Sequence, residues 1–139
     1  MADANDVRTR LTLEDASSHL PMWTEWGVRD VGQFIHSLGC TFLTATGREH
    51  GFAAVSEVPV PHEGPFAHVE EDVRSDSVWF DRTTKRVALL AEFERYAGKK
   101  KDLRPKVETL LLAQQRWGCE DATLLLAYWE CWARDVARP

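Results

Sequence analysis

The chain has 139 residues, of which 44% are hydrophobic and 28% are charged, and its formal net charge is −5. This composition is typical of one soluble globular domain, includes no apolar run long enough for a membrane-spanning helix, and argues against nucleic-acid binding by bulk charge alone. Three cysteines, an odd number without close pairing, argue against a disulfide framework and against a cysteine-rich zinc site. The polar N-terminal stretch lacks the apolar core of a signal peptide, so we expect a cytoplasmic protein without a membrane partner.

The first third of the chain predicts a polar arm followed by one helix. Residues 1–24 are polar and weakly periodic, and we expect a loose arm with room for one short helix. From Val28 to Leu38 apolar residues recur every three or four positions, which is typical of an amphipathic helix that Gly39 would end. Residues 40–46 fit either an extension of this helix or a short strand.

The rest of the chain alternates between strand and turn signals, with one further helix. Residues 62–75 are expected to be an acidic loop, and residues 81–85 have the composition of a hairpin turn. A helix is expected to begin near Asp102, the candidate N-cap, with Pro105 in its first turn and Gly118 at its end. Four segments have strand composition: residues 52–61, 76–80, 87–93 and 122–129.

These elements follow the order α-β-β-β-α-β. Hairpin-linked strands come first, and a crossover helix then leads to one more strand, which predicts a mixed β-sheet flanked by helices. We therefore expect a single α/β domain over residues 25–139, and residues 130–139 could begin a further helix.

Acidic residues interrupt or end the apolar strands. Asp76 begins one strand, Glu92 and Glu94 end the next, and Glu57 interrupts the first. Pairing through the turn at 81–85 should place the Asp76 carboxylate about 4–7 Å from that of Glu92, a gap that one hydrated divalent ion can bridge. Mg²⁺ or Mn²⁺ would relieve the repulsion between these carboxylates and could activate water for phosphodiester hydrolysis.

This arrangement resembles the PD-(D/E)xK nuclease superfamily, whose fold is called restriction-endonuclease-like. The resemblance covers residues 28–130 and depends on Glu57, on Asp76 in RSDSVWFD, and on Glu92 and Glu94 in LLAEFERY. The family pattern is an acid followed by acid-x-Lys on the next strand, and this chain has Glu at the Lys position. Glu57 is either a further metal ligand or the outward face of a half-exposed strand.

The resemblance implies roles for the site residues. Asp76 and Glu92 would hold Mg²⁺, and Glu94 would assist as a ligand or as a base that orients water. The missing positive charge would come from the neighbouring helix, where Lys101 and Lys106 are the candidates.

A basic stretch follows the acidic strand ends. Residues 95–106 contain six basic residues and one acid. They are either a solvated surface or a contact to the phosphate backbone of a nucleic acid. The candidate contact residues are Lys99, Lys100, Lys101, Arg104 and Lys106.

The remaining chemically reactive residues receive structural roles. The five histidines are scattered, and we assign them to the surface because we place none at a metal-ligand spacing from another His or a Cys. The cysteines lie in or beside apolar segments and are expected in the core: Cys40, Cys119 and Cys131. Three tryptophans are expected in the core or a subunit interface: Trp117, Trp129 and Trp132.

Three functional hypotheses remain open. The first is a small metal-dependent deoxyribonuclease that acts on DNA rather than RNA. It would act together with partners, such as a second copy in a homodimer or further copies in a larger assembly, or it would cut branched, nicked or end structures. The second is a catalytically inactive module of the same fold that binds nucleic acid or a protein. The third is an unrelated mixed α/β protein whose strand-end carboxylates have no common role.

Overall fold

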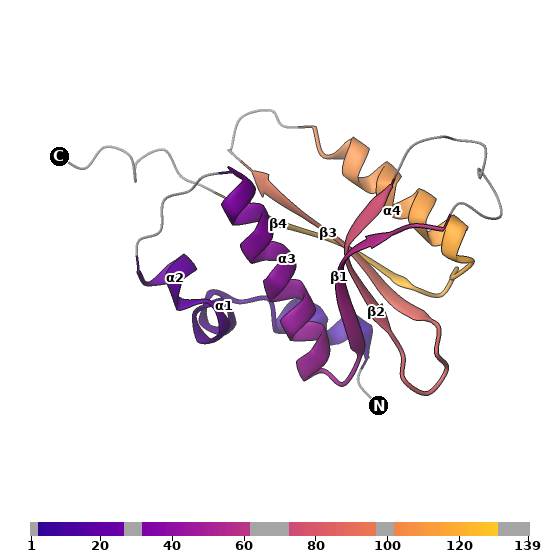
Figure 1. Ribbon diagram of the computed structural model, residues 1–139, viewed down its shortest axis with the longest axis horizontal. Coiled ribbons are helices and arrows are strands. Elements are labelled where there is room, and N and C mark those ends of the chain that lie inside the picture. The colour runs from indigo at the N-terminus through magenta and orange to yellow at the C-terminus, as the bar shows by residue number, and fades with distance from the viewer. Residues whose placement is uncertain (1–2, 27–31, 62–72, 97–101, 131–139) are drawn as a thin grey trace.

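The computed structural model of the protein describes residues 3–26, 32–61, 73–96 and 102–130. A single four-stranded sheet with the strand order β1-β2-β3-β4 forms its centre (Figure 1). Strand β2 is antiparallel to both β1 and β3, whereas β4 is parallel to β3. In chain order the elements are the 3-10 helix η1 (Ala4–Thr9), α1 (Leu13–His19), α2 (Pro21–Thr24), α3 (Gly32–Glu49), β1 (Ala53–Pro59), β2 (Arg74–Phe80), β3 (Val87–Tyr96), α4 (Arg104–Trp117) and β4 (Thr123–Glu130).

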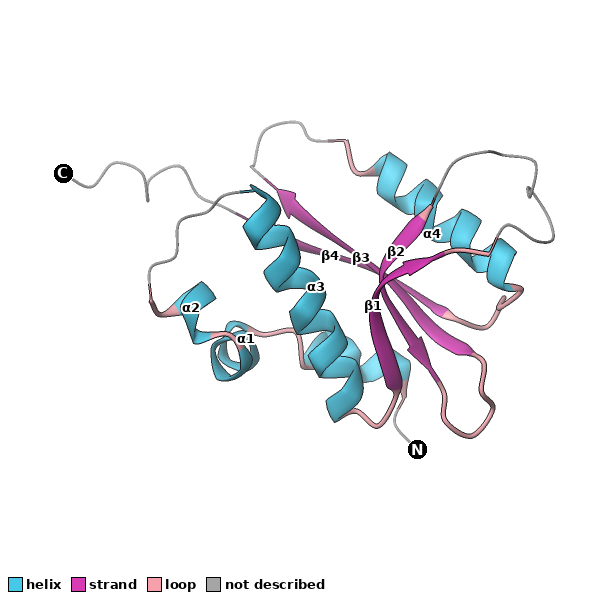
Figure 2. Ribbon diagram, viewed as in Figure 1, coloured by secondary structure: helices cyan, strands magenta, loops and turns pink. Residues whose placement is uncertain are grey.

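Helices cover both faces of the sheet (Figure 2). Helix α3 packs on one face against β1, β2 and β3, and α4 packs against β3, β4 and β2. The connection from β3 through α4 to the parallel strand β4 is the expected crossover. The expected α/β class, the mixed sheet and the order of the main elements are therefore confirmed.

Alternating side chains of the central strands are buried in two separate cores. On β3, Leu89, Ala91 and Phe93 join the core that includes α3, whereas Leu90 joins the core that includes Leu110 of α4. Both faces of β3 are thus buried, which explains its continuous apolar sequence. Two of the tryptophans expected in the core pack against different cores: Trp129 against the core that includes α3, and Trp117 against the core that includes α4.

The N-terminal arm is ordered and packed, unlike the loose arm that its polar sequence predicted. Several of its apolar residues are buried in the α3-side core, with Val7 1%, Ala16 2% and Trp23 7% exposed, whereas Leu13 is 66% exposed. The Trp23 ring makes edge contacts with Phe42 and Phe93. A weak apolar pattern was therefore enough to anchor this segment, because most of its apolar residues reach the same core.

Helix α3 continues through Gly39, so the expectation that this glycine ends the helix is wrong. Of the two alternatives for residues 40–46, the helical extension is confirmed. A Cβ atom at position 39 would overlap the ring of Phe93 on β3. Gly39 therefore allows the helix to approach the sheet closely, and it does not end the helix.

Two connections follow the expected turn chemistry. In the β2–β3 hairpin, Asp81 Oδ1 accepts hydrogen bonds from the backbone N–H groups of Thr83 and Thr84, both at 2.8 Å. Helix α4 ends at Gly118, which has the left-handed conformation with φ 63°. Its N-cap is Leu103, one residue after the expected Asp102, whose Oδ1 accepts the Arg104 N–H at 3.0 Å.

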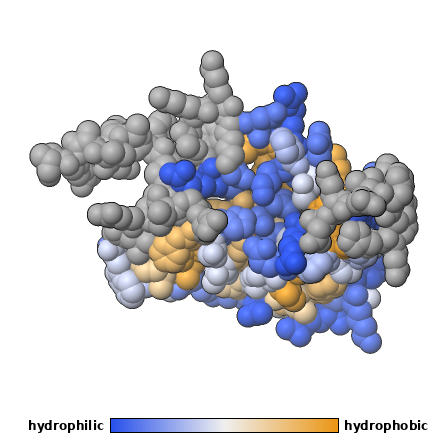
Figure 3. Space-filling view, turned by 45° about the horizontal axis from the view of Figure 1, so that its top comes forward, coloured by the Kyte–Doolittle hydropathy of each residue, from blue (hydrophilic) through white to orange (hydrophobic). Residues whose placement is uncertain are grey.

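The surface is mixed in character. Figure 3 shows hydrophilic residues gathered across the middle of one face, between smaller apolar areas. Within the described residues, no helix combines the length and apolar character that crossing a bilayer requires. The acidic loop expected at 62–75 and the helix expected within 130–139 lie largely outside the described residues.

Replacing Gly39 by alanine should destabilise the protein, although alanine is the better helix former. Alanine gains about 1 kcal/mol of helix propensity, but forcing a methyl group into the Phe93 ring costs about 1–3 kcal/mol. We expect the free energy of unfolding to fall by about 1 kcal/mol in urea titrations. Phe93→Leu should be less damaging in the Gly39→Ala background than alone, and additive effects would contradict the close approach.

Candidate functional site

Three acidic residues meet across adjacent strands of the sheet. The strand ladders pair Ser77 of β2 with Ser56 of β1 on one side and with Ala91 of β3 on the other. The acids lie one residue beyond these pairs: Glu57 and Asp76 have ligand atoms within 4.8 Å of each other, and the side chains of Asp76 and Glu92 interact directly. The structure thus brings together the three strand acids that the sequence analysis named as metal ligands.

Asp76, on the middle strand of the three, is only 5% exposed. Its Oδ2 accepts a hydrogen bond from the Phe93 backbone N–H at 2.7 Å, and its Oδ1 lies 3.4 Å from His36 Nε2. The carboxylate is therefore held in one orientation by groups from β3 and α3.

Glu92 is almost completely buried, with 1% of its surface exposed. Burial and then the charge of Asp76 raise the pKa of Glu92 to about 8, and Lys106 acts in the opposite direction. Its Oε1 atom is buried and receives no hydrogen bond from any described residue. A protonated Glu92 could donate a hydrogen bond to Asp76, which also favours the raised pKa, whereas two ionised carboxylates have no proton to share.

Lys106 reaches this acid pair from the first turn of α4. Its Nζ lies 3.2 Å from Glu92 Oε2 and 3.6 Å from Glu94 Oε2. Burial lowers the pKa of Lys106, but the charges of Glu92 and Asp76 outweigh burial and raise it. The structure therefore places a protonated amine from the neighbouring helix beside the carboxylates, as the resemblance implied for Lys101 or Lys106.

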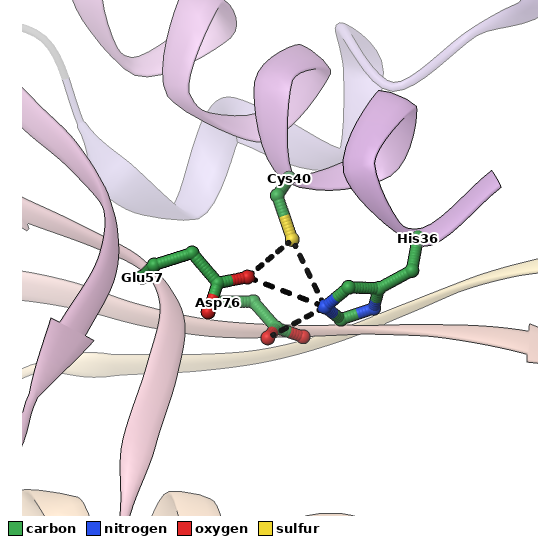
Figure 4. A group of neighbouring side chains, drawn as sticks. All are labelled: His36, Cys40, Glu57 and Asp76. Atoms are coloured by element: carbon green, nitrogen blue, oxygen red, sulfur yellow. Dashed lines mark hydrogen bonds and ion pairs between the residues drawn. The ribbon is translucent and has the colours of Figure 1, made fainter. Parts of the chain in front are cut away.

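A second group of side chains meets Asp76 from the α3 side (Figure 4). His36 Nε2 lies 3.3 Å from Glu57 Oε1 and 3.5 Å from Cys40 Sγ, and Cys40 Sγ lies 3.6 Å from Glu57 Oε1. One ligand atom from each of His36, Cys40, Glu57 and Asp76 lies within 4.8 Å of the other three. These four residues could hold a metal ion.

The composition of this group corrects one statement of the sequence analysis. Cys40 is buried, as expected, and the His36 side chain is 37% exposed, but the statement that no histidine has a metal-ligand spacing from a cysteine is wrong, because Cys40 Sγ lies 3.5 Å from His36 Nε2. The two residues are four positions apart on one helix, which places them on the same face one turn apart. That spacing is the signal that sequence reasoning overlooked, because residues 40–46 fitted a strand as well as a helix.

Backbone geometry contributes to the same group. Glu57 has φ 55°, a left-handed conformation that is uncommon for a residue other than glycine. Its side chain is 49% exposed and still contacts His36 and Cys40. Burial of Cys40, followed by the charges of Asp76 and Glu57, raises the pKa of its thiol, so the thiol is neutral without a cation.

The expected nucleic-acid contacts are only partly described. Lys99, Lys100 and Lys101 lie outside the described residues. The Arg104 side chain is 86% exposed, and its Nη2 forms an ion pair with Asp102 Oδ2 at 2.9 Å. Lys106 faces the carboxylates of β3 and is 30% exposed, so one side remains open to solvent.

Comparison with known proteins identified no relative of this chain. No protein-family model matched it, and neither the curated proteins nor the solved structures compared with it gave a match.

The stability difference between wild type and Glu92→Gln should depend on pH. Because the pKa of Glu92 is raised in the folded state, its contribution is complete below about pH 4.5 and is lost as the pH rises through about 8. Metal-free denaturant titrations should therefore show Glu92→Gln gaining stability relative to wild type across that interval. The exposed residue Glu120 offers a matched control, and a difference for Glu92→Gln that is constant with pH would contradict the raised pKa.

Proposed function

We propose that this protein is a divalent-metal-dependent nuclease with a restriction-endonuclease-like fold. The observation that carries the proposal is the pair of adjacent buried carboxylates, Asp76 and Glu92, with the Lys106 amine beside them. The α-β-β-β-α-β order and the mixed sheet fit the same fold. A lysine delivered from α4 compensates for the Glu at position 94, where the family pattern has Lys.

The donor set fits a hard divalent cation such as Mg²⁺ or Mn²⁺. Glu92 Oε1 is buried without a hydrogen-bond partner among the described residues, and it belongs to a carboxylate whose neighbour carries like charge. Asp76 and Glu92 would hold the ion, with Glu57 as a further candidate from β1. When bound, such an ion polarises a phosphoryl oxygen and lowers the pKa of bound water.

The chain's own groups would position and stabilise the reacting phosphodiester. The Phe93 N–H fixes the orientation of Asp76, at 2.7 Å. Lys106 remains protonated and would stabilise negative charge that develops on the phosphate, which is the usual role of a fixed cation in such a site. Glu94 holds the Lys106 amine from the second side, at 3.6 Å.

The expected substrate is nucleic acid, and DNA in particular. The basic stretch 95–106 connects β3 to α4, and Lys106 belongs to both this stretch and the carboxylate site. A phosphate backbone bound along the basic stretch would therefore end beside the acid pair.

One observation favours the alternative of a non-catalytic nucleic-acid-binding module. The Lys106 amine is shared between two carboxylates, Glu92 and Glu94, and both contacts hold the site together without metal. Such a buried ion pair can be a structural element only. Cleavage by the wild type separates the two functions.

Wild-type protein with Mg²⁺ or Mn²⁺ should cleave at least one of single-stranded, double-stranded or branched DNA. Asp76→Asn, Glu92→Gln and Lys106→Met should each lower the rate at least about 100-fold, because each removes a charge that the reaction requires. The rate is measured on end-labelled DNA, and Glu108→Gln on the exposed side of α4 serves as the control. Absence of cleavage by the wild type on all these substrates and on RNA would refute the nuclease and leave the binding module.

Replacing Lys99, Lys100 and Lys101 together by alanine should weaken DNA binding. The log–log slope of affinity against salt concentration should fall by up to about three, close to one for each phosphate group that is no longer neutralised. Affinities are measured over a salt series, with Arg82→Ala/Lys85→Ala in the β2–β3 turn as control. An unchanged slope would assign these lysines to the solvated surface.

A further inference from the structure

We propose that His36, Cys40, Glu57 and Asp76 form a site for one borderline-soft transition-metal ion of the Zn²⁺ class. This site differs in ligand chemistry from the Mg²⁺ or Mn²⁺ site of the proposed nuclease. It shares only Asp76 and Glu57 with that site, and its existence does not depend on nuclease activity. Figure 4 shows the four side chains converging from helix α3 above and strands β1 and β2 below.

The distances between the donor atoms match a tetrahedral coordination shell. Zn²⁺ ligands at about 2.0–2.3 Å from the ion are separated from one another by about 3.3–3.8 Å. Four of the six donor pairs lie in this range, at 3.3, 3.4, 3.5 and 3.6 Å. The two other pairs join Asp76 to Cys40 and to Glu57 and are within 4.8 Å, so small movements of the Cys40 and Glu57 side chains toward Asp76 would complete the shell.

Hydrogen bonding alone explains this convergence poorly. Glu57 Oε1, Asp76 Oδ1 and Cys40 Sγ all approach the same atom, His36 Nε2. An imidazole nitrogen carries at most one proton, so it can donate to only one of these three neighbours. A cation at the centre interacts favourably with all four donors at once.

The donor types select the class of cation. Sulfur and imidazole nitrogen are ligands for Zn²⁺ and similar ions, whereas Mg²⁺ prefers oxygen atoms in an octahedral arrangement. Two carboxylates complete a mixed nitrogen, sulfur and oxygen shell. The Lys106 amine forms ion pairs with Glu92 and Glu94 on the α4 side. It forms none with Cys40 or Glu57.

The surrounding structure fixes the elements that carry the ligands. His36 and Cys40 lie one turn apart on α3, and Asp76 is oriented by the Phe93 N–H. Next to the site, the Thr44 hydroxyl of α3 lies 2.6 Å from the Ser56 hydroxyl and 2.9 Å from that of Ser77, which joins the helix to β1 and β2. An orienting hydrogen bond on a ligating group is a common feature of metal sites.

Cobalt substitution tests the site directly in the full-length protein, without nucleic acid or Mg²⁺. Co²⁺ bound to wild type should give the visible absorption of a tetrahedral ion and a thiolate-to-cobalt charge-transfer band in the near ultraviolet. Cys119→Ser, which removes another buried thiol, should keep the band, and Cys40→Ser should lose it. A wild type without the band, or a band that survives in Cys40→Ser, would overturn the proposal.

Zinc affinity provides a second measurement that does not depend on Cys40. Competition with a chromophoric chelator should give one Zn²⁺ per chain, and His36→Gln and Glu57→Gln should each weaken binding at least about tenfold. Both side chains are partly exposed, so both variants should fold, as circular dichroism can verify. The matched control is His50→Gln, and equal affinity in all variants would overturn the proposal.

The two proposals fail independently. Lys106→Met should lower the cleavage rate at least about 100-fold if the nuclease proposal is correct, and it should leave the cobalt spectrum unchanged. A protein that cleaves no nucleic acid but shows the charge-transfer band retains the Zn²⁺-class site. A protein that cleaves DNA with Mg²⁺ but shows no band retains the nuclease alone.

Discussion

The burial of carboxylates at the centre of the sheet is the constraint on which the rest of the site depends. An ionised carboxylate is costly to remove from water unless hydrogen bonds or opposite charges compensate it. Asp76 and Glu92 are 5% and 1% exposed, and the compensating groups come from three directions. The Phe93 N–H comes from β3, the Lys106 amine from α4 and the His36 imidazole from α3.

Asp76 connects two chemically different halves of the site. Toward α4, Glu92 and Glu94 meet a protonated amine, and the donors are oxygen atoms suited to a hard cation. Toward α3, His36 and Cys40 add nitrogen and sulfur, which suit a softer cation. One carboxylate in the middle of the sheet therefore faces oxygen and amine groups on one side and nitrogen and sulfur groups on the other.

The approach of α3 to the sheet determines whether the second half exists. Gly39 lies between His36 and Cys40 in the helix, and the absence of its side chain lets the helix backbone rest on Phe93. The same Phe93 donates its N–H to Asp76 and packs against Trp23 of the N-terminal segment. The aromatic core and the polar site are thus joined through one residue, so changes in the packing of α3 should shift His36 and Cys40 relative to Asp76.

The sequence by itself determined the order of helices and strands, the β2–β3 hairpin and the neighbourhood of Asp76 and Glu92. These features follow from local periodicity and turn chemistry, which a short window of residues contains. Only the tertiary structure decided that His36 and Cys40 meet Asp76, that Lys106 reaches Glu92, and that the polar arm packs into the core. Such contacts join segments far apart in the chain, and they depend on how closely a helix crosses the sheet, which no local pattern encodes.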